Sequence, residues 1–421
     1  MAQQTMTASD QPPGSLRGRA RFIGPGLIAA ATGVGAGDIV ASLAAGARLG
    51  MALLWAIVLG AILKYALAEG VGRWHLASDS TILTGWRSLG RWTMIYFGIY
   101  IMIWGFSFGG AAMSATALPL NALFPGVSVR VWGIVAGLAG FALVGMGRYQ
   151  FFERMMTVLV GVMFLTVVGC AIAVASDVDS FAAGLVPRLP ADSVVYVLGL
   201  LGGVGGSITL AAYGYWIREK GWRRPEWMGV MRLDNATAYV VTGIFVIAMM
   251  VVGTALLFGT GQDIGGEEGL VGFADELQDR LGGGVRLLFL IGFFSAAATS
   301  LLGVWNGVSL LFADFVRVVR GVPDDSTDAY VNERSPAFRG YLAWLTFPPM
   351  ALLFLDQPVT LVLVYTALGA IFMPFLAVTL LWLLNRGIAP QYRNGGLSNT
   401  ALGASAVLFV IIAVNEIVGA V

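Results

Sequence analysis

Apolar residues gather along the chain into long stretches, and short polar segments that hold nearly all the charge separate them. A stretch of about 20 apolar residues is long enough to cross a hydrocarbon core about 30 Å thick as a helix. The sequence therefore predicts an all-α integral membrane protein. Its eleven predicted spans lie near residues 22–45, 51–72, 93–120, 130–147, 153–176, 194–217, 236–259, 285–316, 339–355, 359–385 and 398–420.

Basic residues favour one side of the predicted membrane. With the N-terminus inside, the cytoplasmic segments collect 19 of the 25 Lys and Arg, whereas the outer segments are mostly acidic. The positive-inside rule then predicts a cytoplasmic N-terminus in the cell membrane, and an odd number of spans predicts a C-terminus outside. Residues 1–20 are polar and predict a disordered cytoplasmic tail, followed by one transmembrane transporter domain at 21–421.

Composition excludes several classes of protein. With 57% hydrophobic and 12% charged residues, the chain has too little polar surface for a soluble globule, so the lipid bilayer is its predicted environment. Cys170 is the only cysteine, which excludes a disulfide framework and a cysteine metal site. The chain has no phosphate-binding loop and no nucleophile with a base. We therefore expect no enzyme, no cofactor, no nucleic-acid partner and no obligatory protein partner.

Two glycine-rich runs interrupt the first and sixth spans. Residues 32–38 read Thr-Gly-Val-Gly-Ala-Gly-Asp, and residues 202–209 read Gly-Gly-Val-Gly-Gly-Ser-Ile-Thr. Each glycine inside a helix costs about 0.5–1 kcal/mol relative to alanine, so the two runs need a reason. Close helix packing is one reason. The other is unwinding, because transporters with inverted repeats bind cargo between two broken helices near the bilayer midplane.

Asp38 lies inside the first glycine-rich run. An ionisable side chain within a span is costly, and it contacts cargo, pairs with a neighbouring cation or caps a half-helix. If both spans unwind, the predicted substrate-binding positions are Gly35, Asp38, Gly202, Gly205 and Ser207. Asp38 is then the candidate metal ligand. The second run lies five spans after the first, and because five is odd, two repeats of five spans would have opposite orientations.

Several short motifs resemble the Nramp family of divalent-metal transporters. They are Ile-Gly-Pro-Gly-Leu-Ile at 23–28, Ala-Ala-Gly-Ala at 44–47, Leu-Leu-Trp at 53–55 and Met-Pro-Phe at 373–375. The resemblance implies a LeuT-type fold with two inverted five-span repeats, about 22–176 and 194–385, and an extra span at about 398–420. It also adds Thr366 to the candidate substrate-binding residues, because the family has a substrate-facing polar residue there.

The metal-binding motifs of that family are altered in this sequence. Gly35-Ala36-Gly37-Asp38 stands where the family has Asp-Pro-Gly-Asn, and Gly205-Gly206-Ser207 stands where it has Met-Pro-His. Without the sulfur ligand only oxygen donors remain, which suit hard cations such as Mg²⁺. We therefore expect a secondary transporter for Mg²⁺ or for a broadened Mn²⁺/Mg²⁺ range. A carrier for a small organic solute or a monovalent ion, and a membrane sensor or scaffold without transport, stay open as alternatives.

Overall fold

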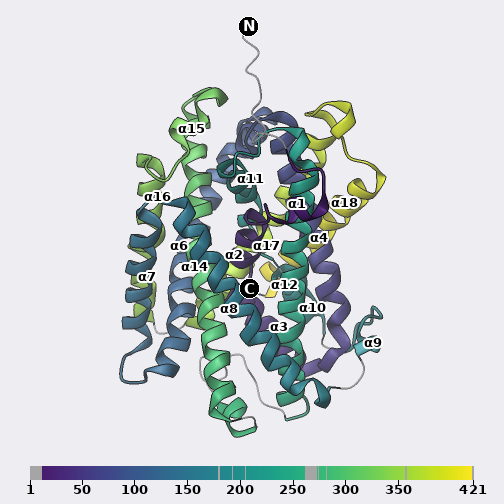
Figure 1. Cartoon of the computed structure of the whole chain (residues 1–421), viewed down its shortest axis with the longest axis vertical. Coiled ribbons are helices and arrows are strands. Elements are labelled where there is room, and N and C mark those ends of the chain that lie inside the picture. The colour runs from purple at the N-terminus through teal and green to yellow at the C-terminus, as the bar shows by residue number, and fades with distance from the viewer. Residues whose placement is uncertain are drawn as a thin grey trace.

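The computed structural model describes residues 12–419 except 179–180, 192, 204, 261–272, 274, 281 and 356–357. All the regular elements described are helices (Figure 1). The longer ones are α2 (Pro25–Gly33), α3 (Ala36–Leu49), α4 (Leu54–Ser78), α6 (Arg91–Leu123), α7 (Val129–Gly145), α8 (Tyr149–Val174), α10 (Val194–Gly203), α11 (Thr209–Glu219), α12 (Met228–Leu257), α14 (Gly283–Val319), α16 (Pro336–Thr346), α17 (Pro358–Arg386) and α18 (Gly396–Gly419).

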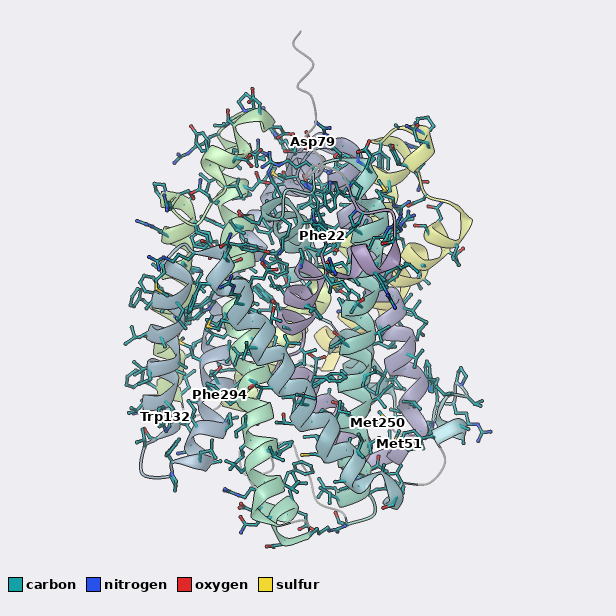
Figure 2. The ribbon with its side chains drawn as sticks, viewed as in Figure 1. Phe22, Met51, Asp79, Trp132, Met250 and Phe294 are labelled. Atoms are coloured by element: carbon teal, nitrogen blue, oxygen red, sulfur yellow. The ribbon has the colours of Figure 1, made fainter. Side chains whose placement is uncertain are left out.

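Each of the eleven predicted spans coincides with these helices. Within the described part of the chain, seven helices are long and apolar enough to cross a membrane, and two more apolar helices are shorter. The ninth span combines α16 with the 3₁₀ helix η6 (Pro348–Leu355). The outer surface carries apolar side chains along the bundle, such as Ile62, Leu165 and Val407, which are more than half exposed (Figure 2). That surface suits contact with lipid tails.

The first and sixth spans are each split into two helices, as the glycine runs predicted. Val34 and Gly35 separate α2 from α3, and both have extended backbone. The second interruption lies between α10, which ends at Gly203, and α11, which begins at Thr209. Figure 1 shows α2, α3 and α17 near the centre of the bundle. The predicted discontinuous spans are therefore confirmed.

The N-terminal segment differs in part from the predicted disordered tail at 1–20. Residues 16–20 form a short helix, α1 (Leu16–Ala20), which Ser15 caps by accepting from the Gly18 N–H at 3.1 Å. Arg19 also donates to the carbonyl of Pro13 at 3.2 Å. This hydroxyl cap and this side-chain bond hold the segment, and sequence polarity alone did not indicate them. Residues 1–11 lie outside the described part.

Packing brings the two broken spans against the same neighbours. Helix α12 contacts α2, α3 and α4, while α14 contacts α2, α3 and α11. Small residues permit these close approaches: a Cβ on Gly46 of α3 would lie 2.4 Å from the carbonyl oxygen of Met250 on α12. Figure 2 shows Met250 and Met51 close together near this contact. Helices α12 and α14 thus form the frame that holds both breaks.

Candidate transport site

The break in the first span directs a carboxylate into the protein interior. Asp38 lies in the first turn of α3, where its Oδ2 accepts from the Gly35 N–H at 3.1 Å. This bond satisfies one amide at the start of the half-helix, and the carboxylate is also favoured by the helix dipole. The residue is only 5% exposed. Its Oδ1 is buried and has no hydrogen-bond partner among the described residues.

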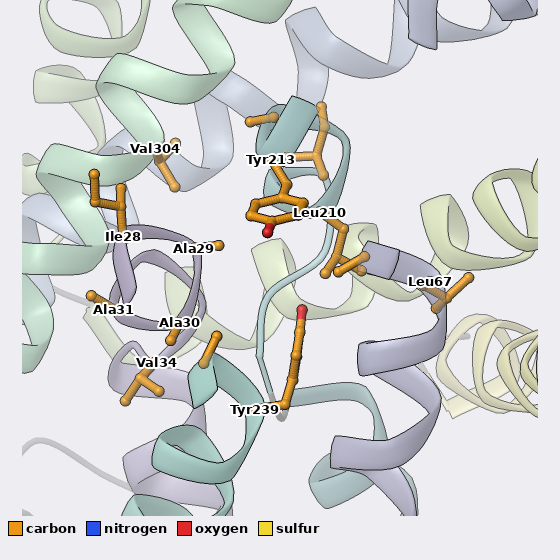
Figure 3. Packing of buried hydrophobic residues seen from close by; sticks show 14 of the residues in the cluster. Ile28, Ala29, Ala30, Ala31, Val34, Leu67, Leu210, Tyr213, Tyr239 and Val304 are labelled. Carbon is orange, nitrogen blue, oxygen red and sulfur yellow. The ribbon is translucent and has the colours of Figure 1, made fainter. Parts of the chain in front are cut away.

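The break in the sixth span depends on two glycines with left-handed backbone. Gly205 has φ +80° and Gly206 has φ +83°, values that side chains other than glycine rarely adopt. A Cβ on Gly205 would also lie 2.6 Å from the ring of Tyr239 on α12. Figure 3 shows Tyr239 beside the extended segment that leads into Leu210 and Tyr213 of α11. Glycine is therefore needed here both for conformation and for space.

Helix α14 binds the carbonyls that the break leaves at the end of α2. Ser300 donates to the carbonyl of Thr32 at 3.1 Å, and Thr299 donates to that of Ala31 at 3.2 Å. Gly303 leaves the room that the Thr32 side chain fills, since a Cβ there would overlap the Thr32 hydroxyl. These hydroxyls donate the hydrogen bonds that backbone N–H groups would donate to the same carbonyls in an unbroken helix.

A cavity of about 50 Å³ lies between the two breaks. Its wall combines polar atoms from both breaks with aromatic rings from spans three and ten: Thr32, Gly33, Gly37, Asp38, Trp104, Phe108, Gly206, Ser207, Thr209, Ser300, Val304, Tyr365 and Gly369. Because about 10–15 Å³ of such volume is enough to hold one water molecule, the cavity has room for a small ion or for water molecules. The Nε1 atom of Trp104 is buried there without a hydrogen-bond partner in the described chain.

The predicted substrate-binding residues fall at the breaks, but they do not all line the cavity. Asp38 and Ser207 contribute to its wall. Gly35 lies just behind, where a Cβ would be 2.9 Å from the Ser300 hydroxyl. Gly205 shapes the backbone through its positive φ, whereas Gly202 lies within α10. Thr366 belongs to α17, and its side chain lies outside the described part, although its neighbour Tyr365 lines the cavity.

Lys64 is a site residue that the sequence did not indicate. Its fully buried ammonium donates to the carbonyl of Gly206 in the sixth-span break. The same ammonium interacts electrostatically with the Asp38 carboxylate. It also lies 5.4 Å from the ring centre of Phe409 on α18. Only the long-range fold reveals this contact, because 142 residues separate Lys64 from Gly206.

The N-terminal end of α2 is held by a second buried carboxylate. Asp234 of α12 accepts from the N–H groups of Gly24 and Gly26 at 2.9 and 2.6 Å, and from the Tyr213 hydroxyl at 2.9 Å. Gly26 allows the approach, because a Cβ there would lie 2.5 Å from the Asp234 carbonyl oxygen. The inner halves of spans one and six are thus joined through one side chain.

The donor chemistry around the cavity is that of oxygen. Within the described residues, no group of three or more His, Cys, Asp and Glu side chains could hold a metal. The only histidine, His75, is buried with 2% exposure, and its ring nitrogens face the carbonyls of Ser80 and Trp222. Trp222 accordingly covers that end of α4.

Comparison with known families agrees with this geometry. The model of the Nramp family, described as natural resistance-associated macrophage protein-like, matches residues 26–419. The chain belongs to the Nramp family. It is accordingly a multi-pass membrane protein of a transporter family rather than of an enzyme family.

Curated relatives of this Nramp chain are distant. The divalent metal cation transporter MntH of Mycobacterium tuberculosis is 24% identical over 330 residues, which cover 74% of this chain and 73% of that protein. The protein of the same name from Chromohalobacter salexigens is 26% identical over 167 residues, or 38% of each chain.

Solved structures share the fold. A mutant of the Eremococcus coleocola manganese transporter has a TM-score of 0.80 at 15% identity, covering 98% of this chain and 91% of its own. MhsT in complex with L-phenylalanine has a TM-score of 0.55 at 15% identity, covering 93% of this chain and 98% of its own. These likenesses concern the fold alone, and they confirm the predicted all-α LeuT-type architecture with interrupted first and sixth spans.

Proposed function

We propose that this protein is a secondary transporter that carries a small hard cation, Mg²⁺ or both Mg²⁺ and Mn²⁺, through the cavity between the two broken spans. The observation that carries the proposal is the buried Oδ1 of Asp38, which faces this region without a hydrogen-bond partner in the described chain. A buried carboxylate oxygen without a donor is costly, and a bound cation would supply the missing interaction. The names of the MntH relatives support a divalent cargo.

The residues around Asp38 favour a hard ion. Ser207, Thr209 and Tyr365 line the same wall, and their side chains carry hydroxyl oxygens. Mg²⁺ accepts few protein ligands because it keeps several of its waters. A soft ion such as Cd²⁺ prefers sulfur, which this wall lacks.

The joined inner half-helices support alternating access. Asp234 connects α2 to α11, so the two segments can open the cytoplasmic side together when its bonds break. We propose that the N-terminus faces the cytoplasm and the C-terminus the outside, in line with the distribution of Arg and Lys. Impermeant labelling of cysteines placed near each terminus of the intact protein tests this orientation.

Transport by purified protein in liposomes tests the proposal. Vesicles that contain a Mg²⁺-sensitive or Mn²⁺-sensitive dye should show uptake of these ions and little uptake of Cd²⁺. Asp38→Asn keeps the size of the side chain but removes its charge, and it should lower the uptake rate at least tenfold. Asp79→Asn is the matched control, because Asp79 is exposed at the end of α4 and has φ 50°, which asparagine tolerates. Equal transport by Asp38→Asn and wild type would contradict the proposal.

A further inference from the structure

The site contains a cation of its own. The Lys64 side chain is fully buried within the membrane-spanning bundle, where lysine is rare because its charge is costly. Its ammonium donates to the carbonyl oxygen of Gly206, a residue that lines the cavity. The ammonium also interacts electrostatically with the Asp38 carboxylate at the other break. Lys64 therefore contacts one break and acts electrostatically on the other.

The position of this ammonium matters for any cation that enters. Backbone carbonyls in broken helices are the usual ligands for transported cations, and the Gly206 carbonyl is already bound by Lys64. In addition, the positive charge of Lys64 cancels much of the attraction that Asp38 offers. The repulsion between Lys64 and a bound ion is proportional to the charge of the ion, so it is twice as large for a divalent as for a monovalent ion.

We propose that Lys64 acts as a fixed internal cation that sets the charge selectivity of the site. It holds one cation position at the sixth-span break and thereby disfavours divalent ions relative to monovalent ions of the same size. This inference rests on the proposed function, since it assumes that a cation binds beside Asp38. It makes Lys64 a specificity-determining residue, and it predicts that the native site binds divalent ions more weakly than a single buried carboxylate would allow.

Removing the charge should change affinity by different factors for different ions. Lys64→Met keeps most of the length of the side chain beside the Phe409 ring but carries no charge. We expect Mg²⁺ to bind at least tenfold more tightly to Lys64→Met than to wild type. Li⁺ has an ionic radius close to that of Mg²⁺, and its affinity should rise only by about the square root of that factor, because the repulsion scales with charge. A purely structural role for Lys64 would not produce this relation.

The measurement is isothermal titration of purified full-length protein with MgCl₂, and with LiCl in competition with Mg²⁺. Lys64→Arg keeps the charge and should retain the wild-type ratio of Mg²⁺ to Li⁺ affinity. Lys64→Gln provides a second neutral variant that can still donate to Gly206, so the test remains valid if Lys64→Met is unstable. Lys220→Met is the matched control. Lys220 is the other lysine of the chain, it does not line the cavity, and its ammonium pairs with the Glu153 carboxylate at 2.6 Å. This variant should leave the affinities for both ions unchanged.

The outcomes separate this inference from the proposed function. If neutral variants and wild type bind Mg²⁺ equally while Asp38→Asn abolishes binding, Lys64 does not set selectivity but the cation site stands. Weaker Mg²⁺ binding in both neutral variants would likewise overturn the inference, since it would mean that Lys64 supports the break. If neither wild type nor any Lys64 variant binds Mg²⁺ or Li⁺, the proposed function itself fails.

Discussion

Gly33 and Gly205 lie in contact where the first and sixth spans cross. A Cβ on Gly33 would be 2.4 Å from the carbonyl carbon of Gly205 and 2.7 Å from its carbonyl oxygen. Both atoms belong to backbone, so no side chain can rotate away to make room. The crossing of the two breaks therefore depends on the absence of a single methyl group, and the small cavity beside them depends on the same contact.

Gly33→Ala should separate the two breaks. Backbone must shift to accept the methyl group, and overpacking of this kind costs about 1–3 kcal/mol. We expect a lower melting temperature and at least a tenfold loss of cation uptake in liposomes. Gly161→Ala is the control, because Gly161 lies in α8 with nothing within 4 Å of its would-be Cβ. Wild-type uptake by Gly33→Ala would show that the contact can relax without effect on the site.

Asp234→Asn should release the inner half of the first span. The substitution weakens charge-assisted bonds to Gly24, Gly26 and Tyr213, each worth about 1.5–3 kcal/mol when fully formed. A cysteine at Val304 in the cavity wall, in a background with Cys170→Ala, should then react faster with a thiol reagent added from the cytoplasmic side. Tyr213→Phe removes only one of the bonds and should give an intermediate rate. Unchanged labelling in both would refute the idea that these bonds keep the inner side closed.

Arg317→Met should be among the most destabilising single changes at the cytoplasmic end. Arg317 is 1% exposed and pairs with Asp314 at 2.6 Å and Asp324 at 2.8 Å. Removing it leaves the fully buried Asp314 carboxylate without its cation, which costs about 3–5 kcal/mol. Thermal unfolding in detergent should show this loss. Arg223→Met breaks a half-exposed pair with Asp328 and should cost less than about 1 kcal/mol; similar losses in both variants would contradict the prediction.

Glu333→Gln should raise stability only at neutral and higher pH. Burial, followed by the nearby Glu219, raises the pKa of Glu333 from 4.5 to about 7, although a 2.8 Å bond from Asn306 opposes this. The folded state therefore binds the proton more tightly than the unfolded state, and the contribution of Glu333 to stability falls as pH rises from about 4.5 to about 7. Glutamine keeps the acceptor oxygen without the charge.

Melting temperatures at pH 5 and pH 8 test this expectation. Wild type and Glu333→Gln should be similar at pH 5, whereas the variant should melt at a higher temperature at pH 8. Glu226→Gln, at an exposed position of the 3₁₀ helix η4 (Pro225–Trp227), should follow the wild-type profile at both pH values. A variant that gains equal stability at pH 5 and pH 8 would show that the charge of Glu333 is not the cause.

The sequence predicted the spans and both breaks because their signals are local. A run of about twenty apolar residues predicts a span, and three glycines within seven residues predict a weakened helix, whatever the rest of the fold is. Asp38 was predicted for the same reason, since a carboxylate within an apolar span is conspicuous by itself. Capping the half-helix and contacting cargo are compatible roles for Asp38. One carboxylate oxygen accepts from the Gly35 N–H, while the other has no hydrogen-bond partner among the described residues.

The roles of Lys64 and Asp234 could not be predicted in this way. Helix α4 is apolar on nearly all sides, so its sequence does not indicate which face meets the sixth-span break. Asp234 contacts Gly24 across 210 residues, and the helical pattern around it carries no sign of that partner.

The eleventh span removes the equivalence of the two repeats. Helix α18 packs on α17, α4 and α10, and its Phe409 reaches the internal cation of the site. Two identical inverted repeats would give inward-open and outward-open forms that are related by a two-fold rotation and equal in energy. A helix outside the repeat that touches one side of the site adds its contacts unequally to the two forms. The two forms of the transporter are therefore expected to differ in energy through the contacts of a helix that neither repeat contains.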